Sequence, residues 1–275
     1  MNKGIDISEH NGTIDFEKVK NSGVDFVIIR IGWIGNKENH TLDNKFEEYY
    51  KQAKLAGLKV GIYVYNYCKS IEAVKSGAKW VLDNLKNREI DMPIFLDMED
   101  SSIIDVTNLN LLCKEFCNII NQTQYISGIY ANKDWFINKL TIQELLNYKI
   151  WLAEWNNQEN HTLGYKVDLW QYTSIGEVPG INGRVDLNKC LCNCYDNNDI
   201  IINNGDDEEV KVYQNGSTEE AVFSDTNCTN KIGSLNKYEK CECLGIFENR
   251  AIVRYKVDNK NNYKIGFVKW LGGVK

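Results

Sequence analysis

Short hydrophobic runs recur through the first 190 residues and predict eight β-strands. They lie at residues 4–8, 25–32, 59–65, 93–99, 127–132, 149–155, 168–172 and 184–188. Most segments between them have helical periodicity, for example 42–57, which ends at Gly57, and 70–87. Alternating strands and helices favour parallel pairing with the helices outside, as in a β/α barrel. Because the helices shorten or vanish after residue 127, we predict an α/β fold with an irregular barrel.

A change in composition predicts two domains. Residues 196–208 are rich in Asn, Asp and Gly, and we interpret them as a linker after a first domain at residues 1–195. The second domain, residues 209–275, contains β-rich runs at 210–216, 220–226, 251–258 and 263–273, with a hairpin tip at 258–262. We predict a small all-β barrel there.

The charge of the chain argues against two classes of partner. A net charge of −6 and a pI of about 5.3 leave no basic surface for nucleic acid or anionic lipid. No run of 18 apolar residues is present, so we expect no membrane insertion. Fifteen Tyr and seven Trp favour a ring-rich surface, and carbohydrate is one ligand that stacks on such rings.

The nine cysteines do not predict a disulfide framework or a metal site. An odd number cannot pair completely within one chain. The C-x-C clusters at 190–194 and 241–243 lack the two-residue gap typical of zinc ligands, and no His lies near them. We therefore expect buried free thiols, no metal and no organic cofactor.

The segment IFLDMED, residues 94–100, places acids at the end of an apolar strand. Side chains alternate faces along a strand, so Asp97 and Glu99 point to the same side. Their Cα atoms would lie roughly 6 to 7 Å apart, close enough for one charge to raise the pKa of the other group. Such a pair suits general acid chemistry, although acids that begin a solvated loop would have the same sequence.

Polar and aromatic residues end most of the other predicted strands as well. They are Asp6, Arg30, Tyr63, Tyr65, Tyr130, Trp155, Gln171 and Asp186. In a β/α barrel the carboxyl ends of the strands surround one bowl, where active sites are built. Tyr63, Tyr65, Trp155 and Gln171 are candidates for sugar contacts, and each is equally compatible with the core. Arg30 is a further candidate, although an Arg beside acids often only pairs with one.

These motifs together resemble a known family. GIDIS near the start, FLDMED in the middle, IWLAEW, and WQYTSIGEVPGINGRVDLN at the end of the first domain are similar to glycoside hydrolase family 25, the Chalaropsis-type muramidases. Residues 212–273 resemble bacterial SH3-type (SH3b) wall-binding domains. The arrangement is similar to endolysins and autolysins of Gram-positive bacteria and their phages, particularly clostridial ones.

The resemblance implies a flattened, TIM-like barrel followed by an SH3-like barrel. It implies cleavage of the β-1,4 bond between N-acetylmuramic acid and N-acetylglucosamine in peptidoglycan, with wall peptide or glycan as the partner of the second domain. Four acids match the family motifs and carry over as catalytic candidates: Asp6, Asp97, Glu99 and Asp186. The Cys-rich segment after Asp186 has no role that the resemblance supplies.

Glycoside hydrolysis divides its chemistry between two carboxyl groups, and the mechanism stays open at this level. Glu99 is our candidate for the acid, with Asp97 ionised beside it and raising its pKa. Asp97 would then orient an attacking acetamido group of the sugar, act as a nucleophile, or leave the activation of water to another acid. Asp6 and Asp186 would hold the geometry, tune the pKa values or bind substrate.

Two other functions are compatible with the same motifs. One is a wall-binding protein whose barrel does not cut, and the other is a hydrolase of another N-acetylhexosamine polymer such as chitin. The N-terminal residues lack the basic start and apolar core of an export signal. From this we expect synthesis in the bacterial cytoplasm and action on the wall after release, through a holin-type pore.

Overall fold

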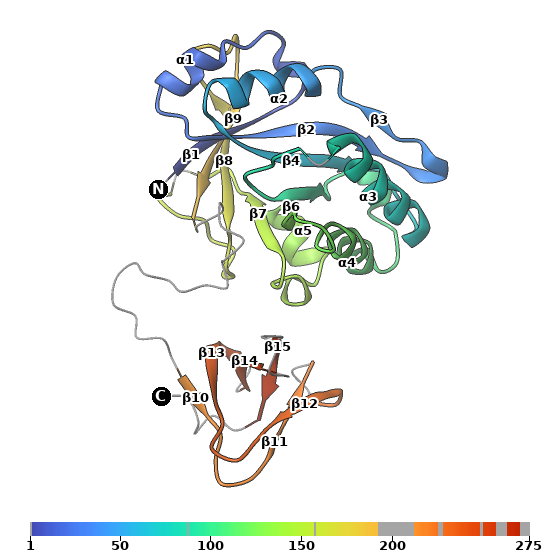
Figure 1. The fold of residues 1–275 in the computed structure, drawn as a ribbon, viewed down its shortest axis with the longest axis vertical. Helices are drawn as coiled ribbons and strands as arrows, with labels where there is room; N and C mark the ends of the chain where they lie inside the picture. The colour runs from blue at the N-terminus through green and yellow to red at the C-terminus, as the bar shows by residue number, and fades with distance from the viewer. Residues whose placement is uncertain are drawn as a thin grey trace. The chain divides into compact units, whose positions relative to one another are not determined.

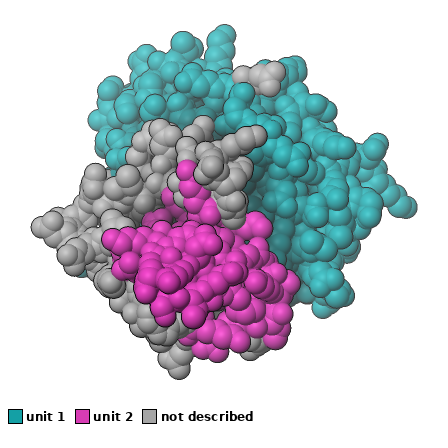
Figure 2. Space-filling view, turned by 60° about the horizontal axis from the view of Figure 1, so that its bottom comes forward, with its two compact units in different colours: residues 1–201 teal, residues 202–275 magenta. Residues whose placement is uncertain are grey.

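The computed structural model describes residues 2–86, 88–156, 158–191, 212–224, 228–247, 250–256 and 263–269. The chain divides into two units, residues 1–201 and 202–275, which Figure 2 colours separately. The predicted linker at 196–208 and the predicted hairpin tip at 258–262 lie outside the described residues.

The first unit is a closed eight-stranded barrel (Figure 1). Its strands follow the order β1-β9-β8-β7-β6-β5-β4-β2, and pairing of β1 with β2 closes the ring. Their bounds are β1 Asn2–Ile7, β2 Phe26–Ile34, β4 Lys59–Asn66, β5 Ile94–Asp97, β6 Ser127–Asn132, β7 Lys149–Ala153, β8 Leu169–Gly176 and β9 Val185–Cys190. These are the eight predicted strands, so the predicted barrel is confirmed.

One strand runs against the prediction of parallel pairing. Strand β9 is antiparallel to both of its neighbours, β8 and β1, whereas the other neighbouring barrel strands are parallel. Only residues 177–184 separate β8 from β9, too few for the crossover that a parallel connection needs. A two-residue strand, β3 Thr41–Leu42, also extends the sheet beyond β2, and the sequence pattern did not predict it.

Helices lie outside the barrel, as Figure 1 shows. They are α1 Phe16–Asn21, α2 Phe46–Leu55, α3 Ile71–Leu85, α4 Leu109–Ile120 and α5 Lys133–Asn138. The start of α3 has an N-cap, since the Ser70 hydroxyl accepts a hydrogen bond from the Ala73 amide over 3.2 Å. The apolar stripe of α3 and that of α4 pack with the outward side chains of the strands in one large core. None of the described helices has the length and apolar composition needed to span a membrane.

The inside of the barrel has its own apolar cluster, in which small and large residues alternate. Three inward glycines lie directly opposite large side chains of a neighbouring strand, in the pairs Gly4–Phe26, Gly61–Ile28 and Gly128–Phe95. A Cβ atom at any of these glycines would lie only 2.1 to 2.5 Å from the side chain opposite. The glycines therefore let large side chains fill the barrel, which leaves its interior closed below the carboxyl ends of the strands.

The second unit is a six-stranded antiparallel sheet in the order β10-β13-β14-β15-β11-β12. The strands are β10 Val212–Gln214, β11 Glu220–Phe223, β12 Lys231–Leu235, β13 Lys240–Phe247, β14 Arg250–Lys256 and β15 Tyr263–Val268. Tyr213, Val222, Leu235 and Val253 are among the residues of its separate apolar core. The all-β prediction is confirmed, and β12 and β13 add strands that the pattern did not predict.

Candidate active site

Asp97 and Glu99 emerge on the same side at the carboxyl end of β5. Asp97 is the last residue of the strand and is buried, with 3% of its surface exposed, whereas Glu99 is exposed. Met98 lies between them and points the other way, into the core between strands and helices. The strand alternation therefore brings the two carboxyl groups together, one deep and one reached by solvent.

The Asp97 carboxyl lies where its negative charge is costly. Burial is the largest cause that raises its pKa well above the ordinary value, and the charges of Glu99 and Asp6 add to the rise. Arg30 opposes the rise. Among the described residues, none hydrogen-bonds to Asp97 Oδ1, although this atom is buried. An unpaired buried oxygen at the mouth of a barrel can accept a hydrogen bond from a ligand.

Glu99 has a milder environment. Burial of its carboxyl by surrounding protein raises its pKa, a hydrogen bond from Tyr130 opposes the rise, and the charges of Asp186 and Asp100 add to it. The residue as a whole remains exposed, so this carboxyl can reach a bond held in the mouth of the barrel.

Asp6 and Asp186 form a second pair of acids across the junction of β1 and β9. They are directly opposite in the antiparallel register, and their carboxyl groups are hydrogen-bonded to each other. Burial is the main cause that raises the pKa of both, and the charge of Asp186 adds to the rise for Asp6. Two carboxyl groups in such contact share a proton, since both cannot be charged without strong repulsion.

Burial adds a cost to an ionised Asp97 that the sequence-based interpretation did not include. That interpretation placed the proton on Glu99 beside an ionised Asp97. Asp97 is the more deeply buried of the two, and burial raises its pKa well above the ordinary value. The physical reason is that β5 ends at Asp97 inside the barrel wall, whereas Glu99 lies beyond it in the mouth. The position of the shared proton stays a prediction.

A hydrogen-bonded network supports these acids from below. Gln171 Nε2 and Asn188 Nδ2 both donate to Asp6 Oδ2, over 2.9 and 2.7 Å. Asn188 in turn accepts from the indole of Trp151 over 2.8 Å. The Tyr130 hydroxyl lies 3.2 Å from Gln171 Oε1. Trp151 and Asn188 were not singled out from the sequence, and Tyr130 was noted only as a residue at the end of a strand. Parity along β9 would have identified Asn188, which lies two residues after Asp186.

Arg30 takes part in an ion-pair network at the edge of the site. Its Nε donates to Asp43 Oδ2 over 2.7 Å and its guanidinium to Glu9 Oε1 over 3.1 Å. The side chain is only 11% exposed. Arg30 therefore holds the loop after β1 and the loop before α2 together, and it acts on Asp97 through its charge. Its predicted contact with a sugar stays a prediction.

The aromatic candidates separate into buried and exposed positions. Tyr63 is half-buried and packs edge-on against Trp151 with ring centroids 5.9 Å apart, as part of the barrel filling. Tyr65 is half-buried, donates from its hydroxyl to Asp100 over 3.1 Å, and contacts the ring of exposed Tyr67. Tyr67 is a further ring at this rim that the sequence reasoning did not select.

Trp155 is the most exposed of the predicted aromatic contacts, with 61% of its surface accessible. Its indole Nε1 donates to Gln171 Oε1 over 3.1 Å. Gln171 itself is buried, so it serves the network under the acids and holds the exposed ring at the same time.

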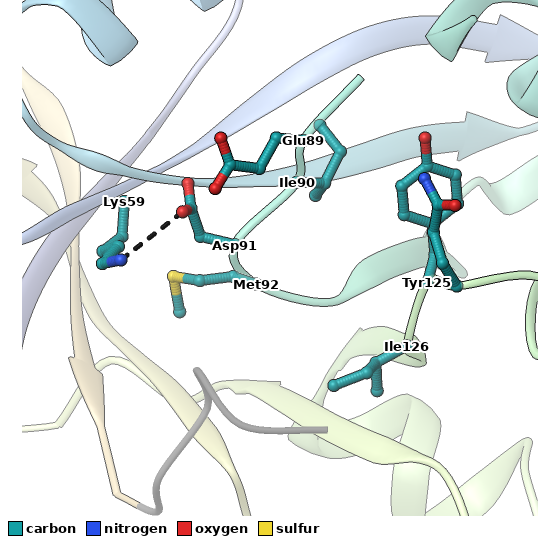
Figure 3. A pocket seen from close by; sticks show the side chains of 8 residues that line it. Lys59, Glu89, Ile90, Asp91, Met92, Tyr125 and Ile126 are labelled. Carbon is teal, nitrogen blue, oxygen red and sulfur yellow. Dashed lines mark hydrogen bonds and ion pairs between the residues drawn. The ribbon is translucent and has the colours of Figure 1, made fainter. Parts of the chain in front are cut away.

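A separate pocket lies at the other end of the strands. Its lining, drawn in Figure 3, includes Lys59, Asp91, Met92 and Ile126. Lys59 begins β4, Asp91 and Met92 lie shortly before β5, and Ile126 directly precedes β6. Asp91 there is already paired with Lys54 over 2.9 Å. In β/α barrels this amino-terminal face serves stability, so the acids at the carboxyl ends remain the candidate site.

In the described part of the chain, no group of three or more His, Cys, Asp or Glu is placed to hold a metal.

Comparison with known proteins decides the family. The model for glycosyl hydrolases family 25 matches residues 5–181, a span that begins just before Asp6 and includes Asp97 and Glu99. This chain belongs to glycosyl hydrolases family 25. Asp186 lies just beyond the matched span.

Relatives in this family include two lysozymes. A stretch of 217 residues is 26% identical to the autolytic lysozyme of Clostridium acetobutylicum and covers 77% of this chain and 63% of that protein. A stretch of 205 residues is 24% identical to lysozyme M1 of Streptomyces globisporus, with 68% and 67% covered. This chain therefore spans less than two thirds of the length of the clostridial relative.

Solved structures share the fold. The modular autolysin LytC of Streptococcus pneumoniae matches with a TM-score of 0.59 at 27% identity, over 68% of this chain and 46% of that one. The spore cortex lytic enzyme SleM of Clostridium perfringens matches with a TM-score of 0.60 at 17% identity, over 97% and 96%. The latter likeness concerns the fold alone.

Proposed function

We propose that this chain is a peptidoglycan hydrolase, an N-acetylmuramidase that cleaves the β-1,4 bond from N-acetylmuramic acid to N-acetylglucosamine. The observation that carries the proposal is the pair of carboxyl groups at the end of β5, with Asp97 buried and Glu99 reached by solvent. Glycoside hydrolysis needs one carboxyl group to protonate the leaving oxygen and a second to stabilise the reacting sugar. Membership of family 25 and the two lysozyme relatives support this choice of substrate.

Glu99 is the proposed acid because its carboxyl lies at the mouth, where a glycosidic oxygen can approach. Asp97 lies deeper, and one of its oxygens has no hydrogen-bond donor among the described residues. The acetamido N–H of an N-acetylated sugar is a donor of the right kind. That bond would favour the charged form of Asp97 and lower its raised pKa, because a hydrogen bond to a carboxylate stabilises the ion.

Substrate binding would then place the negative charge of the pair on Asp97. With Asp97 ionised against the acetamido group, the proton of the pair resides on Glu99, which delivers it to the leaving oxygen. The acetamido oxygen, oriented by Asp97, attacks the anomeric carbon as the bond to the leaving oxygen breaks. Attack by Asp97 itself, or by water activated by another acid, is the competing route.

Reducing-end analysis of digested walls tests the function. Purified Gram-positive walls are treated with the protein, turbidity is followed, and the released muropeptides are assigned by mass spectrometry. We expect loss of turbidity and muramic acid at each new reducing end. Glucosamine there would overturn the muramidase assignment, and digestion of chitin oligomers with walls left intact would favour another N-acetylhexosamine polymer. The anomer released first separates the routes, since initial inversion excludes acetamido attack.

Glu99→Gln separates an enzyme from a protein that only binds walls. The amide keeps the size of the side chain but has no proton to deliver. We expect no lysis, with sedimentation on walls unchanged. Lysis at the wild-type rate by this variant means that Glu99 is not the acid.

For the second unit we propose an SH3b-like role in binding wall peptide or glycan. Its support is the resemblance of its sequence, its antiparallel six-stranded sheet and its separate apolar core. The test compares wall sedimentation of the Glu99→Gln chain with that of the same variant ending at residue 195. Retention that survives the truncation unchanged argues against a targeting role.

A further inference from the structure

Three polar side chains are bonded to one another beside the loop that follows β7. Lys133, the first residue of α5, forms an ion pair with Glu154 Oε1 over 2.8 Å and also donates to the Thr162 hydroxyl. Thr162 donates to the same carboxylate twice, from its amide to Oε2 over 2.6 Å and from its hydroxyl to Oε1 over 2.5 Å. We call Lys133, Glu154 and Thr162 the loop clamp.

The Glu154 carboxylate is fully engaged by this clamp. Its side chain is 11% exposed, and burial by itself raises its pKa. The bonds from Lys133 and Thr162 outweigh that effect and lower the pKa of Glu154 to about 2. The group is therefore charged at neutral pH. It belongs to the structure of the loop and takes no part in the acid chemistry of the site.

The backbone at Glu154 is held with equal firmness. Its amide donates to the carbonyl of Gln171 over 3.1 Å, and its carbonyl accepts from the indole of Trp170 over 2.9 Å. The next residue is Trp155, whose ring is exposed and whose Nε1 is bonded to the Gln171 side chain. The clamp thus fixes the chain immediately before the ring, and Gln171 fixes the far edge of the ring.

We propose that the loop clamp positions Trp155 as a stacking platform for one pyranose ring of the glycan. This inference rests on the proposed function, since it takes a glycan as the ligand. A large exposed ring that is already held loses little rotational freedom when a sugar packs on its face, so the clamp lowers the entropic cost of binding. Lys133, Glu154 and Thr162 are positioning residues, because they act on the sugar through Trp155.

The kinetic test uses the full chain with Lys133→Met and Glu154→Gln. Loss of a well-placed aromatic contact corresponds to about 3- to 10-fold in affinity, so we expect KM for a soluble glycan to rise by that factor with kcat within about twofold. Lys133→Arg, which restores a cation, should recover most of the loss. Lys75→Met is the matched control, since it breaks an ion pair with Glu115 (3.1 Å) on helices α3 and α4, away from the loop. A clamp variant whose kinetics equal those of Lys75→Met overturns the proposal.

A spectroscopic test does not depend on catalysis. The emission of Trp155 is isolated for each protein by subtracting the spectrum of the same protein carrying Trp155→Phe. Its quenching by iodide is then measured. We expect the quenching constant to rise about twofold or more in Lys133→Met and to stay at the wild-type value in Lys75→Met. If the wild-type chain leaves walls intact but the quenching changes as expected, the proposed function fails and the clamp stands. Unchanged quenching in Lys133→Met refutes the clamp, whatever the activity.

Discussion

The side-chain amide of Gln171 donates to Asp6 Oδ2 over 2.9 Å and so joins two residues that are 165 positions apart in the sequence. Because Nε2 is turned to Asp6, Oε1 faces the donors of Tyr130 and Trp155. The orientation of one buried amide therefore links an acid of the first strand to the exposed ring at the rim. This relationship depends on the closure of the barrel through β9, β1 and β2.

Gln171→Leu should weaken both the fold and the site. The change leaves Asp6 with one donor fewer and the Trp155 indole without its acceptor, whereas the Tyr130 hydroxyl keeps Glu99 as an acceptor. Leaving a buried polar group without one of its partners costs about 1 to 3 kcal/mol, so we expect a loss of unfolding free energy of about that size. Chemical denaturation measures it. Gln171→Glu should lower the unfolding free energy further at neutral pH, because it places another carboxylate against Asp6. An equal loss in the two variants would contradict this account.

Asp97→Asn should reduce kcat by about 100-fold or more, since the amide cannot become the anion that orients the acetamido group. Asp100→Asn is the control. Asp100 lies one residue beyond Glu99, but it already accepts hydrogen bonds from Tyr65 (3.1 Å) and the Ser102 amide (2.8 Å). Steady-state rates on a soluble glycan distinguish the two, and comparable losses in both variants would mean that the deep position of Asp97 has no special role.

The pH dependence of stability should reveal Asp6. Burial raises its pKa from 3.8 to about 8, so between these values the folded protein binds more protons at this group than the unfolded chain. Its contribution to stability is complete below pH 3.8 and is lost as the pH rises towards 8, by at most about 1.4 kcal/mol per pH unit for one group. We expect the melting temperature to fall between pH 5 and pH 8.

Asp6→Asn should make that fall shallower. The amide oxygen can still accept from Gln171 and Asn188, but the residue no longer has a charge to bury. Thermal unfolding of both proteins across the pH range provides the comparison. Parallel curves would show that Asp6 does not hold a proton in the folded state.

Gly128→Ala tests the packing inside the barrel. The added Cβ would lie 2.4 Å from the Phe95 ring and 2.7 Å from the backbone oxygen of Lys149, which cannot move aside. Overpacking of this kind costs about 1 to 3 kcal/mol. Gly12→Ala is a useful comparison, since its Cβ would meet open space and only its positive φ of 69° adds strain. Thermal denaturation should show the larger loss for Gly128→Ala if steric filling of the barrel dominates.

Much of the fold and part of the candidate site could be predicted from the local sequence pattern. The eight strand runs, the weak helices after residue 127 and the common side of Asp97 and Glu99 depend on spacing alone, because alternation along a strand and periodicity along a helix are properties of neighbouring residues. For the same reason, each acid could be placed at the end of its own strand. The antiparallel direction of β9 was accessible too, since even the eleven residues between the predicted runs 168–172 and 184–188 are too few for a crossover.

Only the tertiary structure decided what these groups do to one another. Four features arise from contacts between different strands and loops: the burial of Asp97 beyond that of Glu99, proton sharing between Asp6 and Asp186, the pairing of Arg30 with Asp43, and the fixed orientation of Trp155. Charge, burial and hydrogen bonding depend on the surrounding atoms in three dimensions. Closure of the barrel brings those atoms together, and no spacing along the chain encodes the resulting distances.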